Sequence, residues 1–266
     1  MTQVSVPGHF GEWLQGRLGP QGPVALLTLP CPALRVTAGP ETRPTPPPPF
    51  NSVQLDSFFR ALGVPRPKPW PLLVRDMPLG AGAGASTATL IALAQAAGFD
   101  GPAEVLAKAC IDIEGASDPL MLPAPDQVLW ASREGRVLAK LPAPPACDIL
   151  GGFWGAPERT NPEDEAFDDI TDLVELWKVA AGNGDLAECA MLAAASAQRC
   201  SQRRSDARDP TSELARALGA LGHVRAHTGS ARGLIFPRGA MPAKAPDLMS
   251  AAGLHSVFQF RAGAAQ

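Results

Sequence analysis

A run of alternating glycines and alanines in the first third of the chain most constrains its fold. Gly80, Gly82 and Gly84 follow the apolar segment Trp70–Met77, which predicts a buried strand, and precede Ser86–Ala97, a run of helix-forming residues. Glycine permits positive φ and close approach of the backbone to a ligand, and a helix N-terminus offers free N–H groups to an anion. The segment therefore predicts a strand, a glycine loop and a helix, which form either a phosphate site or a tightly packed turn.

Two well-known phosphate loops do not fit this segment. No Gly-Lys-Ser/Thr follows the glycines, as a Walker A loop requires. The dinucleotide fingerprint needs glycine at its first, third and sixth positions, but counting from Gly80 places Ala85 at the sixth. The loop also follows 77 residues instead of opening the chain. These differences argue against a P-loop enzyme and against a Rossmann unit.

The segments on either side of the loop alternate between strand and helix patterns. Short apolar runs bounded by glycine and proline predict strands, and apolar residues at a 3.6-residue period predict helices. The predicted strands are Gln3–Val6, Val24–Leu29, Leu34–Thr37, Val128–Ala131, Val137–Leu141, Ile149–Trp154, Val224–His227, Gly233–Phe236 and His255–Phe260. The predicted helices are Asn51–Leu62, Ala103–Glu114, Pro246–Ala252 and two or three alanine-rich helices before Leu221; Thr42–Pro49 predicts a proline-rich loop and Glu158–Asp169 an acidic, solvated loop. We therefore expect an α+β protein.

Composition narrows the class of partner. The chain of 266 residues is 45% hydrophobic, enough for a sizeable core, and its net charge of −3 gives no general attraction to nucleic acid or to an anionic membrane. Its five cysteines are odd in number and widely spaced, which suggests neither a disulfide framework nor a zinc site. No apolar run approaches the roughly 20 residues of a membrane span. We expect a cytoplasmic protein with reduced thiols and a small-molecule partner.

The glycine loop resembles the second motif of the GHMP kinase superfamily, which includes galactokinase, homoserine kinase, mevalonate kinase and phosphomevalonate kinase. That motif is written roughly P-x-G-x-G-L-G-S-S-A; the proline, the glycines and the last serine match, while Ala83 replaces the usual Leu and Ala85 the first Ser. The resemblance implies that ATP binds to Pro78, Gly80, Ala81, Gly82, Ala83, Gly84, Ala85, Ser86 and Thr87. It also implies that the Ser86 hydroxyl touches Mg²⁺, although a serine at this position can equally cap the helix.

The opening of the chain carries a second and more specific motif. The sequence Pro7-Gly8-His9-Phe10-Gly11-Glu12-Trp13-Leu14-Gln15-Gly16 follows a short predicted strand and is interpreted as a turn with an acid and an amide. It resembles the P-G-x-x-G-E-x-x-Q-G opening of the L-threonine kinases of cobalamin side-chain synthesis. The resemblance implies that four residues contact the substrate: Gly8, His9, Glu12 and Gln15. The alternative is that the glycines are simple turn residues and Glu12 is solvated.

A third motif lies near the other end of the chain, at Ala226-His227-Thr228-Gly229-Ser230-Ala231-Arg232-Gly233. It resembles the third motif of the superfamily, in the threonine kinase form A-H-S-G-x-x-x-G with Thr228 in place of Ser. The resemblance implies that this turn shapes the substrate and phosphate pocket through His227, Thr228, Gly229 and Ser230. Taken alone, the segment is also compatible with an ordinary turn and a surface histidine.

Two acids complete the set of candidate site residues: Glu114, at the end of the predicted helix Ala103–Glu114, and Asp118, which follows it. Superfamily members that use a catalytic base place an aspartate after this helix, and the threonine kinases have a similar E-P-T-D segment. The resemblance implies that Asp118 accepts the hydroxyl proton and that Glu114 holds Mg²⁺ together with Ser86. The spacing from Glu114 to Asp118 is one residue longer than in E-P-T-D, and Asp112 is an alternative metal ligand. An aspartate before proline is also a common turn initiator.

The resemblance extends over nearly the whole chain through these three separated motifs. It implies an N-terminal domain like ribosomal protein S5 domain 2, residues 1–145, and a C-terminal ferredoxin-like domain, residues 146–266, with the active site between them. ATP and Mg²⁺ are the implied cofactors, and phosphorylation of the L-threonine side-chain hydroxyl to O-phospho-L-threonine for cobalamin synthesis is the implied activity. Arg203 or Arg204 could contact the substrate carboxylate.

Three alternatives remain open at this point. The acceptor could be another small hydroxylated metabolite, such as homoserine or an isoprenoid alcohol. The chain could instead be a catalytically silent nucleotide-binding relative, or a protein in which the glycine loop serves tight packing without ATP. The resemblance also leaves a homodimer open.

Overall fold

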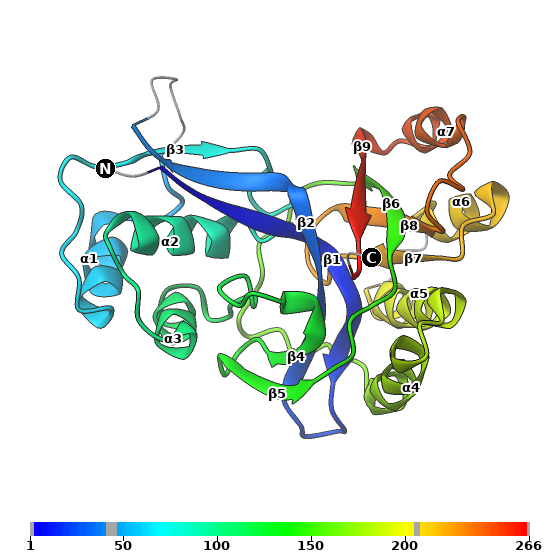
Figure 1. The fold of residues 1–266 in the computed structure, drawn as a ribbon, viewed down its shortest axis with the longest axis horizontal. Coiled ribbons are helices and arrows are strands. Elements are labelled where there is room, and N and C mark those ends of the chain that lie inside the picture. Colours follow the sequence, from blue (N-terminus) through cyan, green and yellow to red (C-terminus); the bar gives the residue numbers. More distant parts are fainter. Residues whose placement is uncertain (1–2, 41–46, 205–207, 265–266) are drawn as a thin grey trace.

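One antiparallel sheet runs through the molecule (Figure 1). In the computed structural model, which describes residues 3–40, 47–204 and 208–264, this sheet has nine strands in the order β5-β4-β2-β1-β7-β8-β6-β9, with β3 paired to β2 outside this path. The strands are β1 (Val4–Arg17), β2 (Val24–Gly39), β3 (Leu72–Arg75), β4 (Val128–Ala131), β5 (Arg136–Lys140), β6 (Cys147–Phe153), β7 (Gly222–Arg225), β8 (Ala231–Phe236) and β9 (His255–Ala262). The expected α+β class is confirmed.

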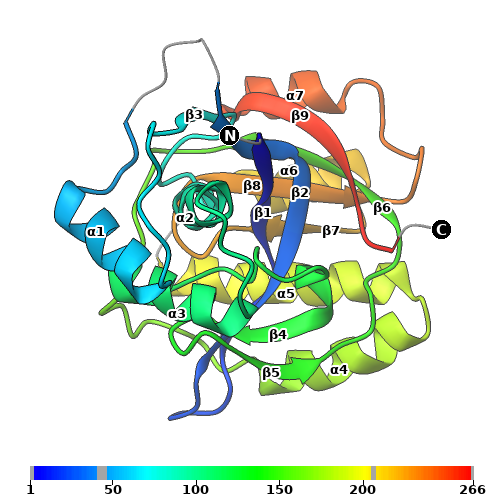
Figure 2. The ribbon, with the colours of Figure 1, turned by 60° about the vertical axis from the view of Figure 1, so that its left-hand side comes forward.

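Helices pack on this sheet in two groups. They are α1 (Ser52–Ala61), α2 (Ala85–Ala96), α3 (Ala103–Glu114), α4 (Thr171–Gly182), α5 (Leu186–Arg203), α6 (Thr211–Leu218) and α7 (Ala245–Ala251), with a short 3₁₀ turn at Pro125–Gln127. The first three helices lie at one end of the sheet and the last four at the other (Figure 1). Figure 2 views α2 nearly end-on, between the sheet and its neighbouring helices. The helices predicted at Asn51–Leu62, Ser86–Ala97 and Ala103–Glu114 are confirmed to within one residue at each end.

The long strand β1 joins the two ends of the molecule. It pairs with β2 along most of its length, and Glu12 pairs with Arg225 of β7. The sheet therefore continues from the part of the chain before residue 145 into the part after it. Because one sheet spans both parts, the division into domains 1–145 and 146–266 stays a prediction.

Phe10 on β1 lies at the centre of the core. Its ring is fully buried and makes edge-on contacts with Phe153, Phe258 and Phe260, at centroid distances of 5.4, 5.1 and 5.6 Å. These three partners come from β6 and β9, far along the sequence. Since the motif at residues 7–16 surrounds Phe10, the same packing that builds the core also fixes the position of that motif.

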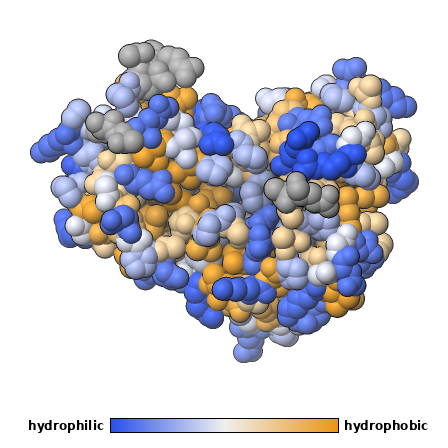
Figure 3. Space-filling model, in the orientation of Figure 1, coloured by the Kyte–Doolittle hydropathy of each residue, from blue (hydrophilic) through white to orange (hydrophobic). Residues whose placement is uncertain are grey.

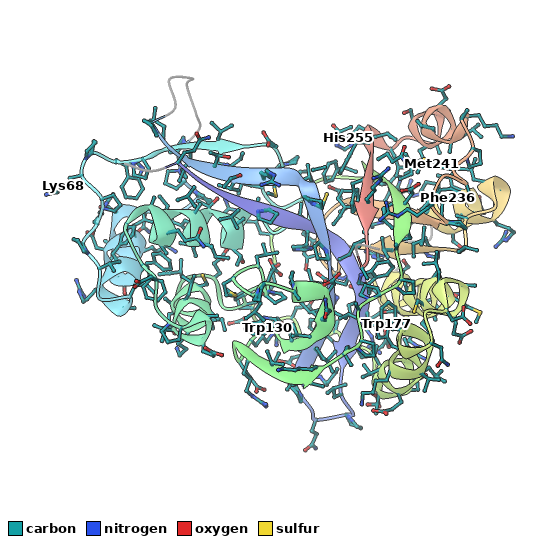
Figure 4. All side chains as sticks on the ribbon, viewed as in Figure 1. Lys68, Trp130, Trp177, Phe236, Met241 and His255 are labelled. Atoms are coloured by element: carbon teal, nitrogen blue, oxygen red, sulfur yellow. The ribbon has the colours of Figure 1, made fainter. Side chains whose placement is uncertain are left out.

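Three tryptophans are buried and pack in the core. Trp13 and Trp177 are fully buried, with ring centroids 5.5 Å apart. Trp130 on β4 is also buried, and its indole N–H donates to the carbonyl oxygen of Ser117 at 2.7 Å (Figure 4). This bond ties the connection after α3 to the sheet, and Asp118 is the next residue in that connection.

Two predictions based on glycine and proline are wrong. β1 continues through Pro7–Gly16, which the sequence predicts as a turn, and β2 joins the two strands predicted at Val24–Leu29 and Leu34–Thr37. The β1–β2 register shifts between Pro7 and Gly8 and again between His9 and Glu12. Such β-bulges accommodate glycine and a residue without an N–H inside a paired strand, so these residues bend the strand instead of ending it.

The strand predicted at Trp70–Met77 is shorter and more exposed than expected. Only Leu72–Arg75 forms a strand, and Leu72 is 40% exposed. Among the described strands, β3 pairs with β2 alone, so it is an edge strand rather than a buried one. Of the proline-rich loop predicted at residues 42–49, positions 42–46 lie outside the described residues.

The surface view in Figure 3 shows an indentation between the two ends of the molecule. None of the described helices combines the length and the apolar character needed to cross a membrane. All five cysteines are buried and free.

Candidate active site

The glycine loop is the point at which three distant segments meet. Its glycines have φ angles between 71° and 74°, which L side chains rarely adopt: Gly80, Gly82 and Gly84. A Cβ on Gly84 would lie 2.5 Å from the His9 ring, and one on Gly82 would lie 2.5 Å from the carbonyl oxygen of Thr228. A Cβ on Gly80 would lie 3.3 Å from the backbone of Glu158. Each glycine therefore makes room for a different segment of the chain.

Backbone hydrogen bonds fix these three segments to the loop. The His9 N–H donates to the carbonyl oxygen of Ala83 at 3.1 Å, and the Ser230 N–H donates to that of Ala81 at 3.1 Å. The Glu158 N–H donates to the carbonyl oxygen of Gly80 at 2.7 Å. The side chains of Ala81, Ala83 and Ala85 are buried. The loop thus directs carbonyl oxygens toward the protein.

Unlike the carbonyl oxygens of the loop, the backbone N–H groups that follow it lie at the start of a helix. Helix α2 begins at Ala85 after a left-handed Gly84, and no side chain caps its first turn. Free N–H groups at a helix N-terminus, reinforced by the helix dipole, favour an anion. They border a pocket of about 320 Å³. The predicted site residues that line it are His9, Glu12, Gly80, Gly82, Ala83, Gly84, Ala85, Ser86, Thr87, Glu114, Asp118, His227 and Thr228.

Asp118 reaches this pocket from the connection between α3 and β4. Gly115 ends α3 with a φ of 78°, and the Ser117 N–H then donates to the carbonyl oxygen of Ser132 at 2.8 Å. With the Trp130 bond described above, both the N–H and the carbonyl of Ser117 are anchored to β4 and the residue after it. The connection therefore presents Asp118 from a rigid support.

His9 lies between Asp118 and Glu12. Its Nε2 is 3.3 Å from Asp118 Oδ2, and its Nδ1 is 3.5 Å from Glu12 Oε1. Burial disfavours the imidazolium, but the two carboxylates, Asp118 first, outweigh burial and raise the pKa of His9 to about 9. Burial would raise the pKa of Asp118, but His9 outweighs it and the pKa falls below its ordinary value. Burial raises the pKa of Glu12 to about 8, and Glu12 Oε2 is buried without a hydrogen-bond partner.

These three side chains offer ligand atoms within 4.8 Å of one another, which is close enough to suggest a metal site. The two nitrogens of the His9 ring, however, face two different carboxylates. One ion could take only one ring nitrogen. The arrangement is therefore better described as a His9–Asp118 ion pair, with Glu12 on the other side of the ring, than as a metal centre.

Glu114 is a better candidate for a metal ligand. The Thr87 hydroxyl donates to Glu114 Oε2 at 3.2 Å, and Ser86 also hydrogen-bonds to this carboxyl. Burial raises the pKa of Glu114 to about 7, against the effect of the two hydroxyls. A buried carboxylate beside two hydroxyls at a phosphate-type helix N-terminus is a donor set that suits Mg²⁺. The alternative ligand Asp112 instead pairs with Lys108 at the surface.

The third motif joins the pocket through His227 and Thr228. The His227 ring stacks on Phe167 at a centroid distance of 4.1 Å, and its Nε2 is 2.9 Å from Arg204 Nη2. Burial and the nearby Arg204 lower the pKa of His227 to about 4, so the neutral ring accepts the hydrogen bond from the guanidinium. Arg204 also pairs with Asp164 at 2.6 Å, whereas Arg203 pairs with Asp168.

Several predicted site residues lie beside the pocket without lining it. The side-chain amide of Gln15 donates to the carbonyl oxygen of Arg225 at 2.9 Å, and the backbone N–H of Gln15 donates to the Ser196 hydroxyl. Gly8 and Gly229 pack against the backbone of the glycine loop, at Ala83 and Gly82 respectively. The residues in this group are Gly8, Gln15, Pro78, Ala81, Gly229 and Ser230. Their roles as ligands stay predictions.

The sequence gives little sign of one further part of the site, residues Glu158–Asp169, called the strap below. We expected this acidic segment to be a solvated loop, and most of its residues are exposed. It nevertheless crosses the mouth of the pocket, where Glu158, Arg159 and Phe167 contribute to the lining. Its acids pair with arginines from other elements, as when Arg133 bonds to Glu165 at 3.0 Å. The sequence does not show which arginine pairs with which acid of the strap, because the partners lie far apart along the chain.

Other lining residues were also missed. Phe50, Gln54 and Leu79 line the pocket from the region of α1 and the start of the glycine loop, and Arg133 lines it from the β4–β5 turn. Isolated aromatic, amide and arginine side chains carry no motif, so only the fold brings them to the site.

The chain was compared with known proteins. A scan against protein-family profiles and a search of curated proteins give no match. Solved structures match over nearly the whole chain. A Listeria monocytogenes protein described as a homoserine kinase is 14% identical, with a TM-score of 0.60 and coverage of 99% of this chain and 99% of that chain.

Two further structures are similar to the same degree. Phosphomevalonate kinase from Streptococcus pneumoniae is 14% identical, with a TM-score of 0.58 and coverage of 98% of this chain and 99% of that chain. Mevalonate kinase from L. major, solved in complex with R-mevalonate, is 14% identical, with a TM-score of 0.57 and coverage of 98% of this chain and 96% of that chain. The chain therefore has the GHMP kinase fold, as its sequence motifs led us to expect.

The packing at the glycine loop leads to a stability prediction. Gly82→Ala places a methyl group against Thr228, whereas Gly219→Ala adds one at a similar φ of 68° with nothing within 4 Å. The left-handed conformation alone costs about 1 kcal/mol, and overpacking adds about 1–3 kcal/mol. We expect urea unfolding to show a loss of about 3 kcal/mol for Gly82→Ala and about 1 kcal/mol for Gly219→Ala. Equal losses would contradict the packing role of Gly82.

The buried group of His9, Glu12 and Asp118 leads to a prediction about pH. The pKa of Glu12 rises from 4.5 to about 8 and that of His9 from 6.5 to about 9, so between pH 6.5 and 8 the folded state binds more protons than the unfolded chain. The free energy of unfolding must therefore fall as pH rises through this window. The slope is about 1.4 kcal/mol per pH unit for each additional proton that the folded state binds. Tm measured by calorimetry should fall accordingly, and Glu12→Gln should flatten the slope.

An exposed acid supplies the control for this measurement. Glu213→Gln on α6 should leave the slope unchanged, because Glu213 is solvated in both states. A Tm that stays constant or rises between pH 6.5 and 8 would contradict the ionisation states given above for His9 and Glu12.

Proposed function

We propose that the protein transfers the γ-phosphoryl group of ATP, with Mg²⁺, to the side-chain hydroxyl of a small acceptor, and that this acceptor is L-threonine. The observation that carries the proposal is that the glycine loop, the uncapped start of α2, Glu114 and Asp118 all border one pocket. Phosphoryl transfer depends mainly on positioning and on electrostatic stabilisation, and these groups supply the parts that it needs.

Each group has a role in this proposal. The N–H groups at the start of α2 bind the phosphate oxygens, with Ser86 and Glu114 holding Mg²⁺, which neutralises charge on the phosphates. Asp118 accepts the proton of the acceptor hydroxyl as that oxygen bonds to the γ-phosphorus, while the bond from this phosphorus to the oxygen that bridges it to the β-phosphate breaks and ADP leaves. Arg159 on the strap contributes positive charge at the mouth of the pocket, facing the same phosphates.

The choice of L-threonine rests on the sequence motifs at residues 7–16 and 226–233, with support from the charges of the site. Glu12 lies on the pocket wall. An α-ammonium group is a donor that an acidic side chain at this wall would bind, whereas mevalonate and other isoprenoid precursors carry no ammonium group. The site therefore favours an amino-acid acceptor. Homoserine, which also carries an ammonium group, is the alternative that the experiment must distinguish.

The proposal is tested by offering the purified protein Mg-ATP with L-threonine, L-homoserine or mevalonate, and detecting phosphorylated product by ³¹P NMR. We expect O-phospho-L-threonine, and a fall of about 10²–10⁴-fold in kcat for Asp118→Asn because the hydroxyl proton loses its acceptor. Asp112→Asn, at the surface of α3, is the matched control and should retain activity. Product from homoserine alone would replace threonine as the substrate, and binding of ATP without any transfer would favour a silent relative.

The metal site is tested separately. Glu114→Gln removes the charge of the proposed Mg²⁺ ligand but keeps its shape and its contact with Thr87. We expect the Mg²⁺ concentration at half-maximal rate to rise at least about tenfold, since one charged ligand is lost. The same titration on Asp112→Asn should match the unmodified protein. A Glu114→Gln variant with an unchanged Mg²⁺ dependence would show that this carboxylate does not hold the metal.

A further inference from the structure

Two arginines bring positive charge to the pocket from different parts of the fold. Among the described residues, Arg133 and Arg159 are the arginine or lysine side chains in the lining. Arg159 belongs to the phosphate side: burial raises the pKa of Glu114, and the charge of Arg159 acts against that rise. Arg133 comes from the turn between β4 and β5 (Figure 1). The phosphoryl transfer proposed for this site uses Arg159 but gives Arg133 no role.

The backbone places Arg133 beside the proposed base. The Ser117 N–H donates to the carbonyl oxygen of Ser132 at 2.8 Å. Asp118 and Arg133 are the residues that follow this bonded pair on the two segments, and both line the pocket. An acceptor whose hydroxyl meets Asp118 therefore has the guanidinium of Arg133 as a near neighbour of its other polar groups.

The guanidinium of Arg133 already binds a carboxylate. Its Nη1 donates to Glu165 Oε1 at 3.0 Å, and its Nη2 donates to the carbonyl oxygen of Asp164. Its Cζ lies 5.4 Å from the centre of the Phe167 ring, which also lines the pocket. Glu165 belongs to the strap, and its side chain is 71% exposed. The Glu165 carboxylate thus shows which kind of group this guanidinium binds at the mouth of the pocket.

This ion pair can be exchanged at little cost. A pair with so exposed a carboxylate contributes little to stability, because water solvates the carboxylate once it is released. Glu165 also pairs with Arg17, and Arg133 also binds the Asp164 carbonyl, so the strap keeps a contact on each side when the pair opens. A ligand carboxylate inside the pocket is less exposed to water than Glu165 and forms the stronger bond with the guanidinium.

The other cations near the pocket are engaged elsewhere. His9 lies between two carboxylates of the site. Arg203 and Arg204, which the sequence suggests as carboxylate contacts, lie outside the pocket lining and pair with acids of the strap. Arg133 is therefore the pocket cation that is placed to receive a carboxylate beside Asp118.

We propose that Arg133 binds the α-carboxylate of the acceptor, and that Glu165 of the strap holds this guanidinium until the acceptor replaces it. The inference rests on the proposed function and narrows its substrate class to amino acids with a free carboxylate, as opposed to amino alcohols or amides. With Glu12 for the ammonium group and Asp118 for the hydroxyl, each polar group of L-threonine then meets a complementary side chain. L-Homoserine carries the same α-carboxylate.

Binding separates a carboxylate contact from a purely structural role. Ligand-observed NMR gives the Kd of L-threonine and of L-threoninamide, in which an uncharged amide replaces the carboxylate, with Mg²⁺ and a non-hydrolysable ATP analogue present. L-Homoserine and its amide are measured in the same way. We expect each amide to bind about 10- to 100-fold more weakly than its acid, because it loses a charge-assisted bond. In Arg133→Gln the acid should weaken by a similar factor and the amide by less than about threefold.

Four further variants sharpen the comparison. Arg133→Lys keeps the charge but not the planar fork, so it should retain part of the preference for the acid. Glu165→Gln removes the competing carboxylate and should tighten binding of the acid by up to about fivefold, whereas Glu163→Gln, another exposed acid of the strap, should not. Arg136→Gln is the matched arginine control, because Arg136 lies in the same hairpin and pairs with Glu134 at the surface.

Two results would overturn the inference alone. These are equal binding of acid and amide by the unmodified protein, and an Arg133→Gln variant that weakens both to the same extent, as a residue that only holds the strap would. If Arg133 governs the preference for the acid but Mg-ATP yields no phosphorylated product, the proposed function fails and the inference stands. If neither amino acid binds, both are overturned. Circular dichroism of each variant shows whether it has folded.

Discussion

The packing of three chain segments against one Gly-x-Gly-x-Gly loop is the constraint on which the rest of the structure depends. The first motif enters beside Gly84, the third beside Gly82 and the strap beside Gly80. A single added methyl group at Gly82 or Gly84 would displace its neighbour, and one at Gly80 would press tightly on the strap. Because β1 carries the first motif and β7–β8 the third, this contact also fixes how the two ends of the sheet meet. The loop is therefore as much a structural joint as a candidate nucleotide site.

This arrangement changes the meaning of the glycines. From sequence, they were interpreted as positions where the backbone approaches a ligand, with close packing as the alternative. In the structure, protein atoms fill the space where a Cβ of Gly82 or Gly84 would lie and closely border that of Gly80, and the groups available to an anion are the amides at the start of α2. The two interpretations are thus complementary, because the packing holds the loop in the conformation that leaves those amides free.

Regular elements were predictable where the physical signal is local. The 3.6-residue spacing of apolar residues, together with the residues that end helices, predicts α1, α2 and α3 well, because the contacts that form a helix are close in sequence. The continuous strand through Pro7–Gly16 was not predictable, since glycine and proline at a bulge look the same as glycine and proline in a turn. The pairing of His9 with Asp118 joins residues over a hundred positions apart, and the strap's contacts with Arg133 and Arg204 are equally distant. Only the fold brings such residues together.

The departures of the loop from the superfamily pattern have a physical explanation in this fold. Ala83 and Ala85 replace a leucine and a serine, and both side chains are buried among other apolar groups. The two hydroxyls that face Glu114 come instead from Ser86 and from Thr87, the residue after it. The two hydroxyls beside the carboxylate are thereby retained, although the sequence places them one residue farther along the helix.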